Sequence, residues 1–548
     1  MTSLGWWIIA LAVGYTVLLL GLGKRANRAG ALGSGYFVGG RSFRTITVAV
    51  CITGLFSGSS FIAITELSYQ TGISALWYGI AETVQVILIA LLLIGPLRER
   101  LVVTVSGLVG DRFGRGPRAL AGAITAITFP MWSVATAIAF ASALHVFTGL
   151  SIPTSVIVTA LLLLGYLWFG GMRSVALTQA ANTIVFGLMV VIGLIAVTID
   201  PGWAALGHLF QSQPRYGSPT GVGSSLIIAW FGTFIVNVIL AQATFQMALS
   251  CKTAKEGRRG LLLAAGFGVP LLLLGVVLGV AAAIVVPDQS LGLVAVARYI
   301  ADALPTPIAG VFFLGIWACA LGWGAPCQFS GATSFGRDVG TAIRPAATEA
   351  QQIRWTRWSL VGLTVLMIIF GFLRTDQSAW WNVLAWTLRN GATLAPVIAA
   401  LFWPLATRTA VYAALSTGFA SGLIWYHLGH WSATHFFAGI HPVWIGMGTN
   451  LITLLTVTLL QTAGTSTLST DPRRRLGGSA ALLVAAMVAV LTVWTWDWSY
   501  AHGLAGLLLF SILALLTVAA FAAVVQRAPV APDDTVAVGA APAVPIPG

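Results

Sequence analysis

The chain has 548 residues, of which 58% are hydrophobic and only 8% are charged, and its mean hydropathy is +0.92. Soluble proteins carry about 25% charged residues, so this composition excludes a soluble globular protein and predicts an all-α polytopic membrane protein. The net charge of +13 does not indicate a nucleic-acid partner, because the Lys and Arg residues cluster in short gaps between apolar segments, as topology signals do.

Hydropathy predicts about 15 membrane-spanning segments, each near the roughly 17–25 residues that a crossing needs. The first, residues 6–22, is followed by Lys24 and Arg25 without a small-residue cleavage site, so we expect a retained helix whose N-terminus lies outside. The remaining segments are expected at residues 45–68, 75–97, 119–148, 154–170, 174–198, 225–250, 261–287, 304–331, 358–374, 381–405, 409–429, 443–462, 478–496 and 502–526.

The basic residues agree with an odd number of crossings. Every Lys and Arg residue except Arg215, Arg298, Arg374 and Arg389 falls in a loop that this topology places inside. We therefore expect a multi-pass protein of the bacterial cytoplasmic membrane with its C-terminus in the cytoplasm. Residues 528–548 are rich in Pro, Ala and Val without helical periodicity, and we expect them to be disordered.

The stretch from Thr53 to Ser60 lies inside an apolar segment but holds two glycines and four hydroxyl residues in eight positions. Such a composition disfavours a regular helix. Backbone groups freed from a helix in lipid cost several kcal/mol each unless protein, water or a ligand satisfies them, so a break here would line a cavity. The alternative is a Gly/Ser seam where two helices pack closely.

Several motifs along residues 30–465 occur in the order and spacing of the sodium:solute symporter family, which includes bacterial proline, pantothenate and sugar symporters. The most specific resemblance lies in Gln242, Gln246 and the run Lys252–Gly260. Further stretches that resemble the family are residues 36–42, 61–62, 72–77, 104–114, 170–178, 335–338, 391–396 and 402–403.

This resemblance implies a LeuT-type fold, in which five helices are repeated in inverted orientation and the first and sixth core helices are broken at the substrate site. The Thr53–Ser60 stretch falls in the first core helix, which favours the cavity interpretation. The implied domains are an N-terminal helix and loop, the ten-helix transport core, two family-type helices, two additional helices and the tail, at residues 1–30, 31–405, 406–465, 466–527 and 528–548.

The positions that correspond to the family's sodium site are degenerate. The resemblance places carbonyl ligands at Thr53, Phe56 and Cys319, but Gly322 and Trp323 stand where the family has hydroxyl residues. The family's Thr-Asp pair is here Thr178-Gln179, so a carboxylate is missing as well. We expect no cofactor; sodium is the coupling ion by resemblance, whereas these departures favour a proton-coupled or uncoupled transporter.

Charged residues within spans are rare and indicate function by default. Glu66, Glu82 and Arg389 lie at similar depth by residue count. We hypothesise that Arg389 pairs with Glu66 or Glu82 as a gate or a proton relay. A fixed ion pair between helices, or direct binding of a substrate carboxylate by Arg389, are the alternatives.

The substrate cavity is expected to be lined by hydroxyl and amide side chains, with tryptophans such as Trp230 and Trp323 stacking on an apolar part of the solute. The candidates are Ser57, Ser59, Ser60, Gln179, Asn237 and Gln242. No cysteine spacing indicates a metal or disulfide framework. The four histidines in one expected loop, His427, His430, His435 and His441, show no diagnostic metal spacing.

The sequence therefore predicts a secondary transporter that imports a small organic solute by alternating access, with the solute and the lipid bilayer as partners. A sensor or receptor that keeps the transporter fold is a rival. An enzyme is disfavoured, because the chain has no HExxH motif, Gly-x-Ser-x-Gly elbow or Asp/His pair with metal spacing. The solute and the oligomeric state stay open.

Overall fold

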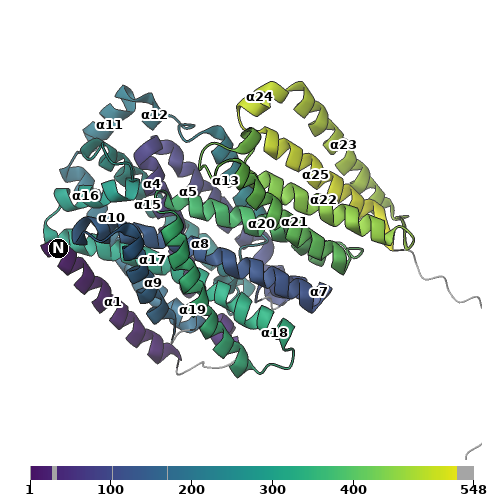
Figure 1. Cartoon of the computed structure of the whole chain (residues 1–548), viewed down its shortest axis with the longest axis horizontal. Coiled ribbons are helices and arrows are strands. Elements are labelled where there is room, and N and C mark those ends of the chain that lie inside the picture. Colours follow the sequence, from purple (N-terminus) through teal and green to yellow (C-terminus); the bar gives the residue numbers. More distant parts are fainter. Residues whose placement is uncertain (1, 28–33, 101–102, 169–170, 527–548) are drawn as a thin grey trace, which may run out of the picture.

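The computed structural model describes residues 2–27, 34–100, 103–168 and 171–526, and these residues are predominantly helical. The predicted disordered tail at residues 528–548 lies outside the described residues. Figure 1 shows a bundle of long helices, with α1 (Ser3–Asn27) at one edge and the C-terminal helices α23 (Pro472–Trp494) and α25 (Ala505–Ala523) at the opposite edge.

The helices follow the predicted segments along the chain. In the first part of the bundle they are α2 (Ser34–Val38), η1 (Gly39–Arg41), α3 (Thr45–Leu55), η2 (Phe56–Phe61), α4 (Ile62–Thr71), η3 (Gly72–Ala75), α5 (Leu76–Leu88), η4 (Ile89–Leu93), α6 (Ile94–Glu99), α7 (Val105–Phe113), α8 (Arg115–Thr148), α9 (Ile152–Trp168) and α10 (Met172–Ile199). In the second part they are α11 (Trp203–Ser212), α12 (Pro214–Gly217), α13 (Ser224–Asn237), α14 (Gln242–Ala248), α15 (Ala254–Val285), α16 (Gly292–Ala303), α17 (Thr306–Thr333), η5 (Ser334–Val339), α18 (Gly340–Ile343), α19 (Glu349–Leu373) and α20 (Ser378–Phe402).

Beyond α20, the chain adds further helices that pack against the bundle. These are α21 (Arg408–Leu428), η6 (Phe437–Gly439), α22 (Pro442–Thr462), α23, α24 (Trp496–Ala501) and α25. Strands β1 (Ser466–Leu468) and β2 (Val524–Gln526) pair antiparallel, with Thr467 opposite Val525. The rings of Trp403 and Phe521 stack at 4.1 Å between centroids, so α25 packs against the end of α20.

Ten helices of the described residues are long and apolar enough to cross a membrane, or up to eleven if the bent pair α13 and α14 forms one span. The sequence predicted about 15 crossings. The difference has physical causes: residues 45–99 form one long helical stretch that turns at Gly72, and α20 carries polar residues such as Asn382 and Arg389. The structure therefore supports a polytopic helical protein, while the number of crossings stays a prediction.

The first core segment differs from the predicted break. Residues Phe56–Phe61 form a buried π-helical turn, and its flanking residues Leu55 and Ile62 keep helical backbone angles, so the chain from α3 to α4 is not unwound. The π-turn widens the helix locally and is frequent at functional sites. A clear bend of 46° lies instead between α13 and α14, where residues 238–241 leave the helix.

Candidate functional site

A small cavity lined by both polar and aromatic side chains lies at the centre of the bundle, next to the bend between α13 and α14. Its volume of about 20 Å³ has room for roughly one water molecule. An organic solute therefore needs this space to enlarge. Seven segments contribute its walls: Leu55 from α3, Glu82 and Gln85 from α5, Phe129 and Trp132 from α8, Asn237 from α13, Ala241, Ala243 and Thr244 at and after the bend, Trp323 from α17, and Trp386 and Arg389 from α20.

Arg389 is the cation of this cavity, and its residue surface is only 4% exposed. Its guanidinium donates a hydrogen bond to Oδ1 of Asn237 and lies 4.5 Å from the ring centroid of Trp132. Its Nε has no hydrogen-bond partner, and no carboxylate among the described residues forms an ion pair with it. The expected pairing of Arg389 with Glu66 or Glu82 is thus not present in this conformation.

Glu66 does not pair with Arg389 but binds the first turn of α20. Its carboxylate accepts hydrogen bonds from the backbone N–H groups of Ser378 and Ala379, each at 3.0 Å, and from the Ser378 hydroxyl at 2.7 Å. These backbone groups belong to the first turn of α20, whose N–H groups have no partner within the helix. Glu66 of α4 therefore caps α20 across the bundle, favourably placed at the positive end of its dipole.

Glu82 faces the same cavity as Arg389 and is almost fully buried. It accepts a hydrogen bond from the Ser60 hydroxyl, and Ser59 is hydrogen-bonded to Tyr78 at 3.2 Å. No Lys or Arg among the described residues forms an ion pair with Glu82. The cavity therefore holds one carboxyl group and one guanidinium that do not neutralise each other directly.

The six predicted substrate-binding residues do not lie in one place. Asn237 lines the cavity, and Ser59 and Ser60 lie behind it against Tyr78 and Glu82. Gln242 instead joins three elements, since its amide nitrogen donates to Ser330 and Ser334 and its oxygen accepts from the backbone of α7. Ser57 and Gln179 lie together at the contact of α3, α10 and α17, next to Gly54 and Gly322.

Sequence reasoning did not select Gln85, Phe129, Trp132, Thr244 and Trp386, although they line the cavity. Gln85 was detectable, because it follows Glu82 by three positions and so shares its helix face. The two tryptophans were not, because the chain has 21 of them and an interfacial or lipid-facing position is their ordinary role in a membrane protein. Identifying the tryptophans that line the cavity requires knowledge of the tertiary contacts.

The histidines do not converge on a metal site. Nδ1 of His441 accepts the backbone N–H of Val443 at 3.1 Å, so this residue caps α22. Among the described residues, no group of three or more His, Cys, Asp or Glu side chains could hold a metal ion.

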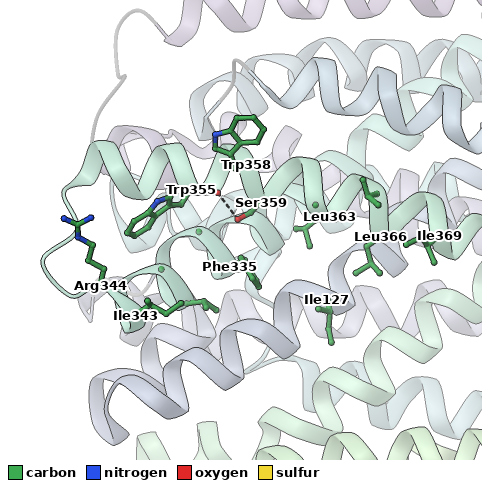
Figure 2. A pocket seen from close by; sticks show the side chains of 15 residues that line it. Ile127, Phe335, Ile343, Arg344, Trp355, Trp358, Ser359, Leu363, Leu366 and Ile369 are labelled. Atoms are coloured by element: carbon green, nitrogen blue, oxygen red, sulfur yellow. Dashed lines mark hydrogen bonds between the residues drawn. The ribbon is translucent and has the colours of Figure 1, made fainter.

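A larger apolar groove lies at the periphery, between α8, η5, α18 and α19 (Figure 2). Its volume is about 780 Å³, and its walls include Phe335, Trp355 and Trp358. The hydroxyl of Ser359 bonds to the carbonyl of Trp355 in its own helix at 2.8 Å, so it is not free for a solute. The groove thus lacks converging polar groups and is not a site for a polar solute.

Comparison with known proteins assigns the family. The model of the sodium:solute symporter family matches residues 36–420. The chain belongs to this family. Its members are transporters, so the predictions that the chain is a transporter and is not an enzyme are confirmed. The chain is also similar to a monocarboxylic acid transporter of Corynebacterium glutamicum, at 23% identity over 457 residues that cover 76% of this chain and 82% of that protein.

Among solved structures, the chain resembles a Na+-coupled sialic acid symporter in a substrate-bound, outward-open state. The TM-score is 0.68 and the identity 17%, and the match covers 83% of this chain and 97% of that one. At this identity the likeness shows the fold. Family and fold together establish a multi-pass membrane protein that works as a secondary transporter of a small solute.

Proposed function

We propose that this transporter imports a small organic monocarboxylate across the bacterial cytoplasmic membrane, and that Arg389 binds the carboxylate. The observation that carries the proposal is a buried guanidinium that faces the central cavity without an acidic partner among the described residues. An arginine within the membrane costs at least about 2.5 kcal/mol, so a functional partner is expected. The similarity to a monocarboxylic acid transporter supports this choice of solute.

The side chains around the cavity suit a small acid with an apolar body once the cavity enlarges. The planar guanidinium can bind both oxygens of a carboxylate. Trp132 and Trp386 supply apolar faces beside it, and Asn237 already orients the guanidinium by accepting one N–H. A solute with a second charge would bring an unpaired ion into this dry space, which favours a monocarboxylate over a dicarboxylate.

Alternating access around the cavity is part of the proposal. The bend between α13 and α14 borders the cavity, and the π-turn at η2 lies in the corresponding position of the first core segment. In an inverted repeat these two elements are the sites where helices part. We accordingly assign the transport core to residues 31–405, with the N-terminus outside and the C-terminus in the cytoplasm.

Proton coupling through Glu82 is favoured by one further observation. Glu82 and Arg389 line the same cavity, and Glu82 accepts a hydrogen bond from Ser60 but has no ion-pair partner among the described residues. An ionised Glu82 would repel a carboxylate bound at Arg389, because both charges lie at low dielectric. A proton on Glu82 removes this repulsion, so solute and proton would enter together. Glu66 is less suited, since its carboxylate is engaged with the first turn of α20.

Uptake by proteoliposomes tests the proposal. The wild-type protein should accumulate radiolabelled acetate or propionate and should not transport the corresponding neutral amides. Arg389→Ala should lower uptake by about 100-fold, and Arg389→Lys should retain part of it, because a point charge replaces the bidentate fork. Arg344→Ala, at the edge of the apolar groove, is the matched control and should leave uptake unchanged.

Two outcomes contradict the proposal. Full uptake by Arg389→Ala would show that the guanidinium does not bind the solute. Binding of a carboxylate without accumulation would favour a sensor that keeps the transporter fold.

A further inference from the structure

The side chain of Gln179 lies where α3, α10 and α17 meet. Its Nε2 donates a hydrogen bond to the carbonyl oxygen of Gly322 on α17. Its Oε1 accepts from Nδ2 of Asn182 at 3.0 Å, and Oδ1 of Asn182 accepts from the Tyr15 hydroxyl at 2.8 Å. Gln179 and Asn182 are almost fully buried, so we name this chain from Tyr15 to Gly322 the amide bridge.

Two glycines make room for the amide bridge. A Cβ atom on Gly54 would lie 2.4 Å from Nε2 of Gln179 and 2.3 Å from the Gly322 oxygen. A Cβ atom on Gly322 would lie 2.9 Å from the Ser57 hydroxyl. Both glycines are therefore needed for α3 and α17 to approach each other around the amide. The fit shows that the Gln179 amide fills this contact rather than pointing into the central cavity.

The positions that the family resemblance assigns to sodium surround this contact. A sodium ion needs several oxygen lone pairs directed at one point. Here the Gly322 oxygen receives an amide proton, the Thr53 hydroxyl donates to the Ala49 carbonyl, and the Thr53 carbonyl accepts the Phe56 N–H of its own helix. Trp323 supplies only an indole donor and lines the central cavity. These residues do not fit a sodium ion.

We propose that the amide bridge takes the place of the sodium ion in this transporter. The Gln179 N–H group satisfies the Gly322 carbonyl and joins α10 to α17 without a charge, so the contact is complete without sodium. Transport would then depend on another driving force or run as exchange. This inference rests on family membership and on the amide bridge, and it holds whichever small solute the central cavity accepts.

Thermal unfolding of the purified full-length protein tests sodium binding directly. We expect the same melting temperature in sodium chloride, potassium chloride and choline chloride at equal ionic strength, because a ligand stabilises only a state that binds it. Acetate is added to the same samples as a separate arm, so a failure of the proposed function appears there and not in the salt series. A sodium-specific rise of several degrees would overturn the inference.

Gln179→Glu sharpens the test, because it has the same length and places a carboxylate oxygen where Nε2 now faces the Gly322 oxygen. Two facing oxygens repel each other unless a cation or a proton lies between them. We expect this variant to gain a sodium-specific stabilisation at neutral pH that acid removes. Gln328→Glu is the matched control, since Gln328 is buried on α17 beside Met367 and away from the bridge.

If sodium raises the melting temperature of Gln179→Glu no more than that of Gln328→Glu, the contact between residue 179 and the Gly322 carbonyl is not a place that a cation can occupy. If the variant does not fold, the wild-type salt series decides alone. Uptake of labelled solute by the wild-type protein in sodium-free medium gives a second readout and should equal uptake in sodium.

Discussion

The central cavity is much smaller than the peripheral groove, but the buried charged groups lie in the cavity and not in the groove. The groove in Figure 2 has a volume of about 780 Å³, with mainly apolar walls and an exposed arginine, Arg344, at one end. The central cavity has only about 20 Å³ but contains Arg389 and Glu82, both buried. Apolar walls at the surface of a membrane protein are ordinary, since lipid tails cover them.

The difference teaches that burial of charge, and not volume, favours the central cavity as the site that we propose for the solute. A buried guanidinium and a buried carboxyl group reduce stability unless another interaction compensates. The buried Glu66 is compensated by the first turn of α20, whereas Arg389 and Glu82 have no ion-pair partner among the described residues. Among the described residues that line it, the groove contains no buried charge that would reduce stability, and the hydroxyl of Ser359 in its wall donates a hydrogen bond within its own helix.

After Arg389, the largest effect is expected for Glu82→Gln. The substitution keeps the shape of the side chain and removes its exchangeable proton, so accumulation driven by an inward proton gradient should fall at least about 10-fold. Exchange of labelled for unlabelled solute, which needs no net proton movement, should persist. The measurement is uptake into proteoliposomes with and without an imposed pH difference.

Glu349→Gln, on the exposed first turn of α19, is the matched control for Glu82→Gln. Undiminished gradient-driven accumulation by Glu82→Gln would exclude this residue as the proton carrier.

An intermediate effect is expected for Glu66→Ala. The substitution leaves the N–H groups of Ser378 and Ala379 without their acceptor and should lower stability by about 2 kcal/mol, measured as a lower melting temperature. Glu66→Gln should lose less, because an amide oxygen still accepts. If Glu66→Ala melts like the wild type but no longer transports, Glu66 acts as a gate and not as a helix cap.

The smallest effect is expected for Gly362→Leu in the groove. A Cβ atom at Gly362 meets no atom within 4 Å, so the larger side chain fills part of the groove without a clash. Uptake should stay within about twofold of the wild type, because the groove lies apart from the central cavity. A tenfold loss of uptake at unchanged melting temperature would give the groove a role in transport and would contradict the assignment of that role to the central cavity alone.

Much of the fold was predictable from the sequence, because apolar segments of sufficient length must be helical in lipid. The Thr53–Ser60 stretch shows the limit. Its glycines and serines weaken a helix in isolation, but close packing, with Gly58 against Trp323 and the Cys319 carbonyl, is compatible with a continuous helix that absorbs the irregularity as a π-turn. Composition cannot distinguish a π-turn from an unwound segment.

The site was predictable in part. The rarity of charge in lipid singled out Glu66, Glu82 and Arg389, and counting residues gave their similar depth. The direction of each side chain depends on how its helix is rotated about its axis, and counting residues along the chain does not give this rotation. Glu66 therefore reaches the first turn of α20 and Arg389 reaches Asn237. Gln179 was expected in the cavity because it is polar, but its partner, a backbone carbonyl, has no signature in the sequence.

Helix α1 has a consequence for the order of assembly during synthesis. Its Tyr15 hydroxyl is held by Asn182, and its Thr16 hydroxyl accepts the indole N–H of Trp317 at 3.0 Å. These partners are made 167 and 301 residues later, so α1 can bind α10 early but completes its contacts only after α17 has been synthesised. Loss of the Trp317 indole should therefore weaken a contact that forms late in assembly, whereas loss of Asn182 should weaken an earlier one.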